Sequence, residues 1–297
     1  DPKDSQGLNV GNNGGDQTIG PGEKRQYTYY AHPSNKETTS LVWDGGNIVV
    51  NPRNGLYGAI IVGPRGSQYR DPMTGGDISQ KNSWRADVIV DTTLPENVGK
   101  RNYRDVALFF QDEDNIIGTA FMPYVQNVAG LTSVNYRAEP YKFREDQGCS
   151  LGKIFQPCVV GKPEDPATPV IEAHAGDALR IHVIGANSEQ NGMFGIEGHE
   201  WPIEPYMPGA DMISVVEYAG SETLDVFVRG GAGGPYRQVG DFVWSNQRLP
   251  YTQSGQWGYL RVLPAGDTRI QPLGAFGAAA KRADLAPQPK ATPTAMK

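Results

Sequence analysis

The sequence has few cysteines and histidines, no long apolar run and no excess of positive charge. Two cysteines and four histidines occur among 297 residues, and the net charge is −6. Without about 18 consecutive apolar residues, no segment is predicted to span a membrane. Acidic and basic residues are mixed along the chain, which excludes the basic stripe that a nucleic-acid groove needs. The same mixture makes an anionic membrane surface an unfavourable partner.

Helical periodicity is also nearly absent, whereas 37 glycines and 23 prolines are present. They separate short runs rich in β-branched and aromatic residues, which is typical of many strands joined by tight turns. The sequence therefore predicts an all-β protein, and its length favours two domains. The predicted strands are Gln26–Ala31, Tyr57–Val62, Ala86–Val90, Val106–Phe110, Ala178–Ile184, Thr223–Val228 and Trp257–Leu263.

Two distant segments end in the same way. GLYGAIIVGPRG (Gly55–Gly66) and GQWGYLRVLPAG (Gly255–Gly266) each place an aromatic–Gly pair before an apolar strand, and then Pro and Gly. This similarity indicates two homologous sandwiches that finish with the same kind of strand.

The cysteines Cys149 and Cys158 lie close together in CSLGKIFQPC. A disulfide between them would close a short loop and contribute about 2–3 kcal/mol. The alternative, a thiol or metal pair, lacks CxxC spacing and a nearby histidine. A disulfide implies an oxidising compartment, so we expect an extracytoplasmic protein that is periplasmic, exposed on the cell surface or secreted.

The segments around the predicted strands differ in composition. Residues 144–169 form a connection punctuated by Gly and Pro that carries the cysteines. Residues 265–297 are rich in Ala, Pro, Lys and Thr and are predicted to form a flexible tail. The chain opens at Asp1 without methionine, from which we expect a processed or trimmed product.

Three stretches, taken in order, resemble the multicopper oxidase family, whose members are built of cupredoxin domains. They are IGPGEKRQYTYYA (Ile19–Ala31) with GLYGAIIVGPRGSQYRDP (Gly55–Pro72), TPVIEAHAGDALRIHVIGANSEQNGMFGIEGHEW (Thr168–Trp201) and GDFVWSNQRLPYTQSGQWGYLRVLP (Gly240–Pro264). The resemblance implies two Greek-key β-sandwich units and, in functional relatives, four copper ions that oxidise a substrate and reduce dioxygen. Residues 1–80 would be the C-terminal part of one cupredoxin-like domain, incomplete at its N-terminus, and residues 81–264 would be a second domain.

Copper in this family is held by imidazoles and a thiolate, which suit Cu(I) and Cu(II). Ser245, Asn246 and Gln247 stand where the family has His-Cys-His. The other ligand positions that the resemblance assigns hold Tyr251, Gly192, Gly195 and Glu197 in place of histidines and Gln256 in place of the axial residue. His199 matches a histidine that is not normally a ligand. The sequence therefore predicts no copper, no other cofactor and no catalytic residue in this chain.

Two further groups of residues leave alternatives open. His174 and His182, with Glu172 or His199, could form a small metal site, but hydrogen-bonded histidines on strands are favoured. Asp112–Asp114 could bind calcium through carboxylate oxygens, but lacks the spacing of a calcium loop, and a polar turn is favoured.

These observations favour a copper-free structural or protein-binding component of a larger assembly. Its partner would be another protein or a second copy, and an upstream copper-bearing fragment is one candidate. One alternative is a fragment or subunit of an active multicopper oxidase whose copper sites lie on other polypeptide. A second alternative is a surface-layer or filament assembly protein.

Overall fold

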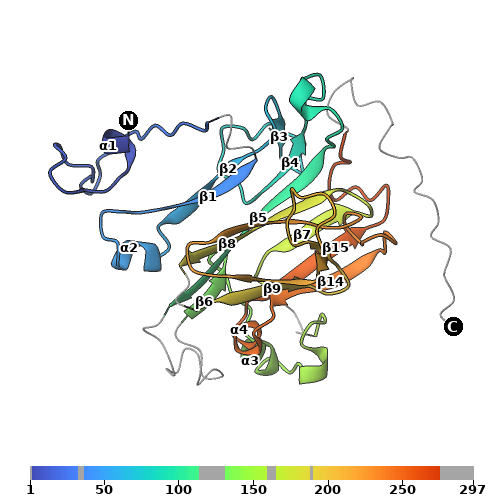
Figure 1. Ribbon diagram of the computed structural model, residues 1–297. Helices are drawn as coiled ribbons and strands as arrows, with labels where there is room; N and C mark the ends of the chain where they lie inside the picture. Colours follow the sequence, from blue (N-terminus) through green and yellow to red (C-terminus); the bar gives the residue numbers. More distant parts are fainter. Residues whose placement is uncertain (1, 33–36, 114–130, 159–164, 188–189, 275–297) are drawn as a thin grey trace.

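The computed structural model describes residues 2–32, 37–113, 131–158, 165–187 and 190–274 (Figure 1). Strands dominate, and two sheets face each other to form a sandwich. This arrangement confirms the predicted all-β sandwich. None of the helices in these ranges is long and apolar enough to cross a membrane.

One layer of the sandwich is a five-stranded sheet. Its neighbouring strands are antiparallel except for the last pair, in which β7 runs parallel to β15. Its order is β12 (Val215–Tyr218), β9 (Gly192–Ile196), β14 (Gly240–Asn246), β15 (Trp257–Leu263) and β7 (Val170–His174).

The second layer is a six-stranded sheet, in which β5 runs parallel to β8. The chain alternates between the layers from β7 to β9 and again from β12 to β14, so consecutive strands lie in opposite sheets. Its order is β13 (Thr223–Phe227), β8 (Leu179–Asn187), β5 (Tyr103–Glu113), β4 (Arg85–Ile89) and β3 (Gln68–Arg70), with β6 (Leu131–Val134) also paired to β5.

Apolar side chains fill the space between the two sheets. Leu108 and Ile181 come from the six-stranded sheet, and Trp244 and Leu260 come from the other layer; all four are buried. Because side chains of a strand alternate between its faces, Arg180 and His182 point to the outer face of the six-stranded sheet. Both are nevertheless buried, so another element must cover that face.

A hairpin supplies this cover. β1 (Thr38–Trp43), the short helix α2 (Val50–Arg53) and β2 (Tyr57–Val62) form a separate two-stranded sheet. Leu41, Ala59 and Ile61 of the hairpin pack against Ala107 and Ile184 of the sandwich. In Figure 1 the hairpin lies along the six-stranded sheet, with the N-terminal arm extending beyond it.

Short elements complete the fold. β10 and β11 form a separate antiparallel two-stranded sheet. In Figure 1, α3 and α4 lie at one end of the sandwich. The bounds are α1 (Pro2–Ser5), α3 (Tyr141–Glu145), α4 (Leu249–Gln253), β10 (Trp201–Pro202), β11 (Met212–Ile213) and the 3₁₀ turns Pro95–Asn97 and Leu151–Lys153.

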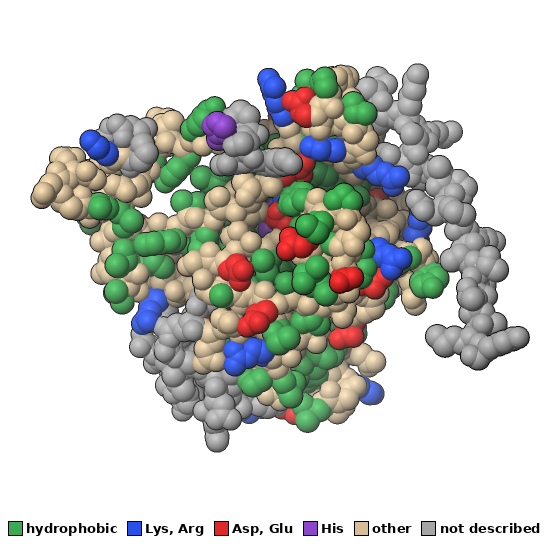
Figure 2. Space-filling view, in the orientation of Figure 1, with side chains coloured by type: hydrophobic (Ala, Val, Ile, Leu, Met, Phe, Trp, Pro, Cys, Tyr) green, Lys and Arg blue, Asp and Glu red, His purple; other side chains and the backbone are tan. Residues whose placement is uncertain are grey.

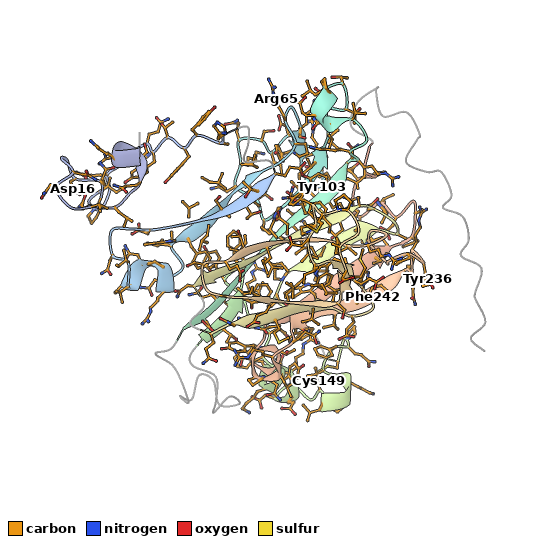
Figure 3. All side chains as sticks on the ribbon, viewed as in Figure 1. Asp16, Arg65, Tyr103, Cys149, Tyr236 and Phe242 are labelled. Atoms are coloured by element: carbon orange, nitrogen blue, oxygen red, sulfur yellow. A yellow bond between two sulfur atoms is a disulfide. The ribbon has the colours of Figure 1, made fainter. Side chains whose placement is uncertain are left out.

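The predicted disulfide between Cys149 and Cys158 is confirmed. Cys149 follows α3 at the lower end of the view in Figure 3. Buried Arg144 holds this connection by donating hydrogen bonds to the carbonyls of Ile154 at 2.9 Å and Gln156 at 3.0 Å. The connection is therefore fixed by both a covalent and a polar contact.

Most predicted strands are found, and β2 and β15 begin and end where they were predicted. The strand predicted at Gln26–Ala31 is wrong, because that segment has no partner strand in the described residues. The polar turn predicted at Asp112 is also wrong: β5 continues through Glu113 because β6 pairs with it. Asp114 lies outside the described residues.

The predicted domain boundary, between residues 80 and 81, falls in the loop from β3 to β4. The tail predicted for residues 265–297 is described only as far as residue 274. In this part Gln271 N–H donates a hydrogen bond to the carbonyl of Pro72 at 2.7 Å.

Candidate functional site

The positions that the resemblance assigns to a blue copper ion form one buried cluster. Asn246 ends β14, and Gln256 directly precedes β15; each side chain is 1% exposed. Asn246 Nδ2 donates hydrogen bonds to Gln256 Oε1 at 2.8 Å and to the Tyr218 hydroxyl at 3.2 Å. Asn246 Oδ1 accepts the main-chain N–H of Met193 at 3.0 Å. Tyr251, the remaining position in this stretch, lies in α4, and its carbonyl accepts the Gln256 N–H at 3.0 Å.

The ring of Tyr218 takes the space of the missing histidine at Gly192. The two residues are paired across β12 and β9. A β-carbon added to Gly192 would lie 2.1 Å from Cζ of Tyr218, so no side chain fits there. Burial raises the pKa of Tyr218 well above its ordinary value, and the phenol stays protonated. Its ring also packs against Phe110, with 4.9 Å between the centroids.

These residues do not fit a copper ion. A blue copper site needs a thiolate and imidazoles, whereas this cluster offers an amide at Asn246, a second amide at Gln256 and no side chain at Gly192. Both side-chain polar atoms of Asn246 are already hydrogen-bonded inside the protein. We therefore derive no electron-transfer step through this position.

The remaining ligand positions that the resemblance assigns lie on the outer face of the five-stranded sheet. Gly195 and Ser245 are direct neighbours across β9 and β14. The Gln247 side chain covers Gly195, where an added β-carbon would lie 2.6 Å from Gln247 Nε2. Glu197 directly follows β9, and its side chain is exposed. The structure thus brings these positions together on one surface, and none of the described residues at these positions carries an imidazole.

The side chain of His199 forms hydrogen bonds with main-chain groups of Glu197 and Gly233. Its Nδ1 lies 2.8 Å from the carbonyl oxygen of Glu197, and its Nε2 accepts the N–H of Gly233 at 3.1 Å. Burial lowers the pKa of His199, which favours the neutral form that accepts this bond. Both ring nitrogens are therefore used within the protein.

His182 lies between two carboxylates under the hairpin. Its side chain is 0% exposed, with Nε2 2.7 Å from Asp105 Oδ1 and Nδ1 2.6 Å from Asp225 Oδ1. Thr39 of β1 adds a hydroxyl oxygen 2.7 Å from Nδ1. Burial alone would lower the pKa of His182, but the two carboxylates outweigh it and raise the pKa above its ordinary value.

A second cation extends this cluster towards the start of the hairpin. Arg180, which is fully buried, donates to Asp225 Oδ2 at 2.8 Å and to Glu37 Oε2 at 3.2 Å. Burial raises the pKa of Asp225, but His182 and Arg180 lower it further than burial raises it, so the net shift is downward. The cluster is therefore a charged link between the hairpin segment and the sandwich.

His174 belongs to a different buried cluster at the end of the sheets. Arg104 donates to Asp87 Oδ1 at 2.7 Å and to Asp177 Oδ2 at 2.6 Å, and its Nη2 lies 3.3 Å from His174 Nδ1. Burial raises the pKa of Asp87 to about 6, because the pairing with Arg104 offsets only part of the desolvation. Within the described ranges, no three His, Cys, Asp or Glu side chains are grouped so that they could hold a metal ion.

The hairpin repeats the hydrogen-bond pattern of the last two strands of the sandwich. In each unit a strand is followed by a short helix, a glycine with positive φ (Gly55 at 89° and Gly255 at 111°) and a second strand. This pattern is the structural counterpart of the sequence similarity between the two segments. The matching bonds are Asp44 N to Leu56 O and Asn246 N to Gln256 O, both 2.9 Å, and Leu56 N to Asn51 O and Gln256 N to Tyr251 O, both 3.0 Å.

The two units differ in what covers them. Leu260 of β15 points into the sandwich core, whereas Ile60, its counterpart in β2, points away from the sandwich and is 38% exposed. Hydrophobic side chains gather over α2 and the hairpin in Figure 2. We call this surface the hairpin patch; its exposed members are Ile48, Val49, Val50, Leu56 and Ile60.

A groove of about 850 Å³ runs between β2 and the outer face of the six-stranded sheet. One end is closed by Tyr136, which stacks on Tyr57 with 5.2 Å between the ring centroids. Lys81 and Arg85 are the positively charged residues that line the groove. Its wall is formed by Tyr57, Ala59 and Ile61, and its floor by Trp84, Ala86, Asp105, Ala107 and Phe109.

Sequence reasoning missed the pairing of Gly192 with Tyr218 and the charged cluster around His182. The first joins residues of two strands that no local pattern connects. The second did have a signal: Arg180 and His182 alternate with apolar residues in β8, and that polar face is covered by residues from the distant hairpin.

No protein-family model and no curated protein sequence matches this chain. Solved structures do match. A multicopper oxidase aligns with 82% of this chain and 62% of its own length, with a TM-score of 0.47 and 15% identity. The blue copper oxidase from Nitrosomonas europaea aligns over 83% and 61%, with a TM-score of 0.48 and 17% identity.

The copper nitrite reductase from Nitrosomonas europaea aligns with 85% of this chain and 70% of its own length, at a TM-score of 0.48 and 16% identity. This chain spans 62% and 61% of the lengths of the two oxidases. The chain is similar to these three solved structures, and its sequence motifs resemble the multicopper oxidase family.

Proposed function

We propose that this chain is a copper-free structural and protein-binding component of a larger assembly outside the cytoplasm. The observation that carries the proposal is the replaced copper position, where the Asn246 amide is fully hydrogen-bonded and Tyr218 fills the space at Gly192. The sandwich around it keeps a continuous apolar core. A fold survives the loss of a site in this way because function resides in residues placed on the fold.

The hairpin supports the protein-binding part of the proposal. A two-stranded sheet is at best marginally stable by itself, and this one buries only one of its faces against the sandwich. The other face belongs to the hairpin patch, and large exposed apolar patches mark interaction surfaces. The Cys149–Cys158 disulfide supports an oxidising compartment.

The metal content of the chain tests the proposal. The purified protein is incubated with Cu(II) and with Cu(I) under reductant, dialysed and analysed by mass spectrometry for bound copper. We expect far less than one equivalent and no thiolate-to-copper absorption. One equivalent of copper, located by anomalous diffraction beside Asn246, would overturn the proposal.

The native complex is analysed in the same way. We expect a protein partner and no copper in it. Copper in that complex, together with oxidation of a phenol, Fe(II) or Mn(II), would instead assign the chain as a subunit of an oxidase.

A further inference from the structure

We propose that the groove beside β2 receives one extended strand of another polypeptide chain, which runs parallel to β2. This inference rests on the proposed protein-binding role and names the place and the kind of segment that is bound. It depends on the free edge of β2, on the repeat between the hairpin and the sandwich, and on the charge of the groove.

The free edge of β2 presents unpaired main-chain groups to the groove. The carbonyl of Leu56 bonds to Asp44 N–H on the β1 side. Because main-chain groups alternate between the two edges of a strand, those of Tyr57, Ala59 and Ile61 face the groove. The Tyr57 carbonyl accepts a bond from Tyr136 at 3.3 Å. The main-chain groups of Ala59 and Ile61 have no partner within the described part of the chain.

The corresponding edge of β15 is paired. There β7 runs parallel to β15, with Val170 beside Tyr259 and Glu172 beside Arg261. The hydrogen bonds shared by the two units place Ala59 and Ile61 where Tyr259 and Arg261 stand in the sandwich. In the groove, the described residues therefore supply no counterpart of β7 to the hairpin. An edge of this kind is a template for strand addition.

The groove also fits a strand by shape and charge. Its floor at Ala107 and Phe109 continues the apolar layer that the hairpin already buries, so an added strand would extend an existing interface. Among the charged groups that line it, Asp105 is paired with His182, and Arg85 lies 3.9 Å from Glu172. Lys81 is exposed and forms no salt bridge among the described residues, although its charge helps to lower the pKa of Asp77. The bound strand would therefore carry a carboxylate on its floor-facing side.

A capped peptide with the sequence TPVIEAHA, residues 168–175, is the probe. In the register of β7, Val170 and Glu172 would face the groove floor, and Ile171 and Ala173 would face away from the sandwich. The peptide is titrated to millimolar concentration into the ¹⁵N-labelled full chain. We expect shifts of the Ala59 and Ile61 amides and of the groove floor, whereas the β1 edge stays unchanged.

The Ala59→Pro variant removes the N–H that faces the groove and leaves the bonds to β1 in place. We expect the peptide affinity to fall about tenfold, in keeping with the loss of a main-chain bond. Ala59→Val keeps the N–H and is the matched control, with affinity within about twofold. Equal binding by both variants would overturn the proposal, as would the absence of shifts.

Two further arms test orientation and charge. A spin label at the peptide N-terminus should broaden resonances near Tyr57 more than those near Val62, because the strands are parallel; the reverse pattern overturns that orientation. The Lys81→Glu variant should bind the unmodified peptide more weakly than the wild type does. It should bind a peptide that carries Glu172→Lys more tightly. If Lys81→Glu changed the affinity for both peptides in the same direction, the proposed pairing of Lys81 with a carboxylate of the bound strand would be wrong.

Other occupants give different results. Slow hydrogen exchange of the Ala59 and Ile61 amides in the isolated chain would show that its own residues fill the groove, and would overturn the proposal. If the chain forms a dimer and Ala59→Pro abolishes it, the strand that occupies the groove comes from a second copy of this chain, and not from a different protein. If the native complex is indifferent to Ala59→Pro, the strand site is wrong although the protein-binding role stands. If no native complex exists, the proposed function itself fails.

Discussion

Replacing Asn246 with alanine should destabilise the protein by about 2–4 kcal/mol. The substitution removes an amide that bonds to Gln256, to Tyr218 and to the N–H groups of Met193 and Arg248. A buried polar group left without a partner costs about 1–3 kcal/mol. At least the Met193 N–H and the Gln256 side-chain oxygen would be left in this state, and a partial return of water would offset some of the cost.

Urea unfolding followed by fluorescence, at constant pH and with a fixed m-value, measures the change. Ser245→Ala is the matched control, because Ser245 is the preceding residue, is also buried in the same strand (7% exposed, against 1% for Asn246) and has no side-chain hydrogen bond in the described structure. We expect it to change stability by about 1 kcal/mol or less. If Asn246→Ala were as mild as Ser245→Ala, the amide network would not be what replaced the metal at this position.

Three further outcomes are expected. Gly192→His should cost about 3 kcal/mol or more in urea unfolding, because its side chain would overlap Tyr218; stability equal to wild type would refute the packing argument. The raised pKa of His182 means that its contribution is complete below about pH 6.5 and is lost as the pH rises through the folded-state value. Thermal unfolding from pH 6 to 9 should show this loss in the wild type and not in His182→Gln. Replacing Cys149 and Cys158 together with serine should cost about 2–3 kcal/mol, and a smaller loss would mean that Arg144 alone holds the connection.

Local sequence patterns predicted the parts of the fold that local chemistry decides. The strand at Trp257–Leu263 and the disulfide are determined by residues that are close in the chain, and both were predicted. Alternation along β8 puts Ile181 in the core and Arg180 on the opposite face. The burial of Arg180 could not be predicted, because the hairpin that covers it is more than a hundred residues away along the chain.

The candidate site divides in the same way. The resemblance assigns Asn246 and Gln256 to ligand positions, and the structure brings their side chains together because a strand, a short helix and a second strand follow one another there. It could not indicate that Tyr218 would fill the space at Gly192, since that contact depends on the register between two strands. Likewise, the end of β5 at Glu113 depends on β6 and not on the acidic residues themselves.

The contact between Tyr218 and Gly192 makes any return to metal binding a multi-step route. A histidine restored at position 192 collides with the phenol ring, and a cysteine restored at 246 deprives Gln256 and the Met193 main chain of their partners. Each single reversal therefore passes through a weaker protein with no compensating ion. Simultaneous changes at Gly192, Tyr218 and Asn246, which lie on three different strands, would be needed to avoid this loss of stability. The packing that fills the copper position therefore opposes a stepwise return to metal binding.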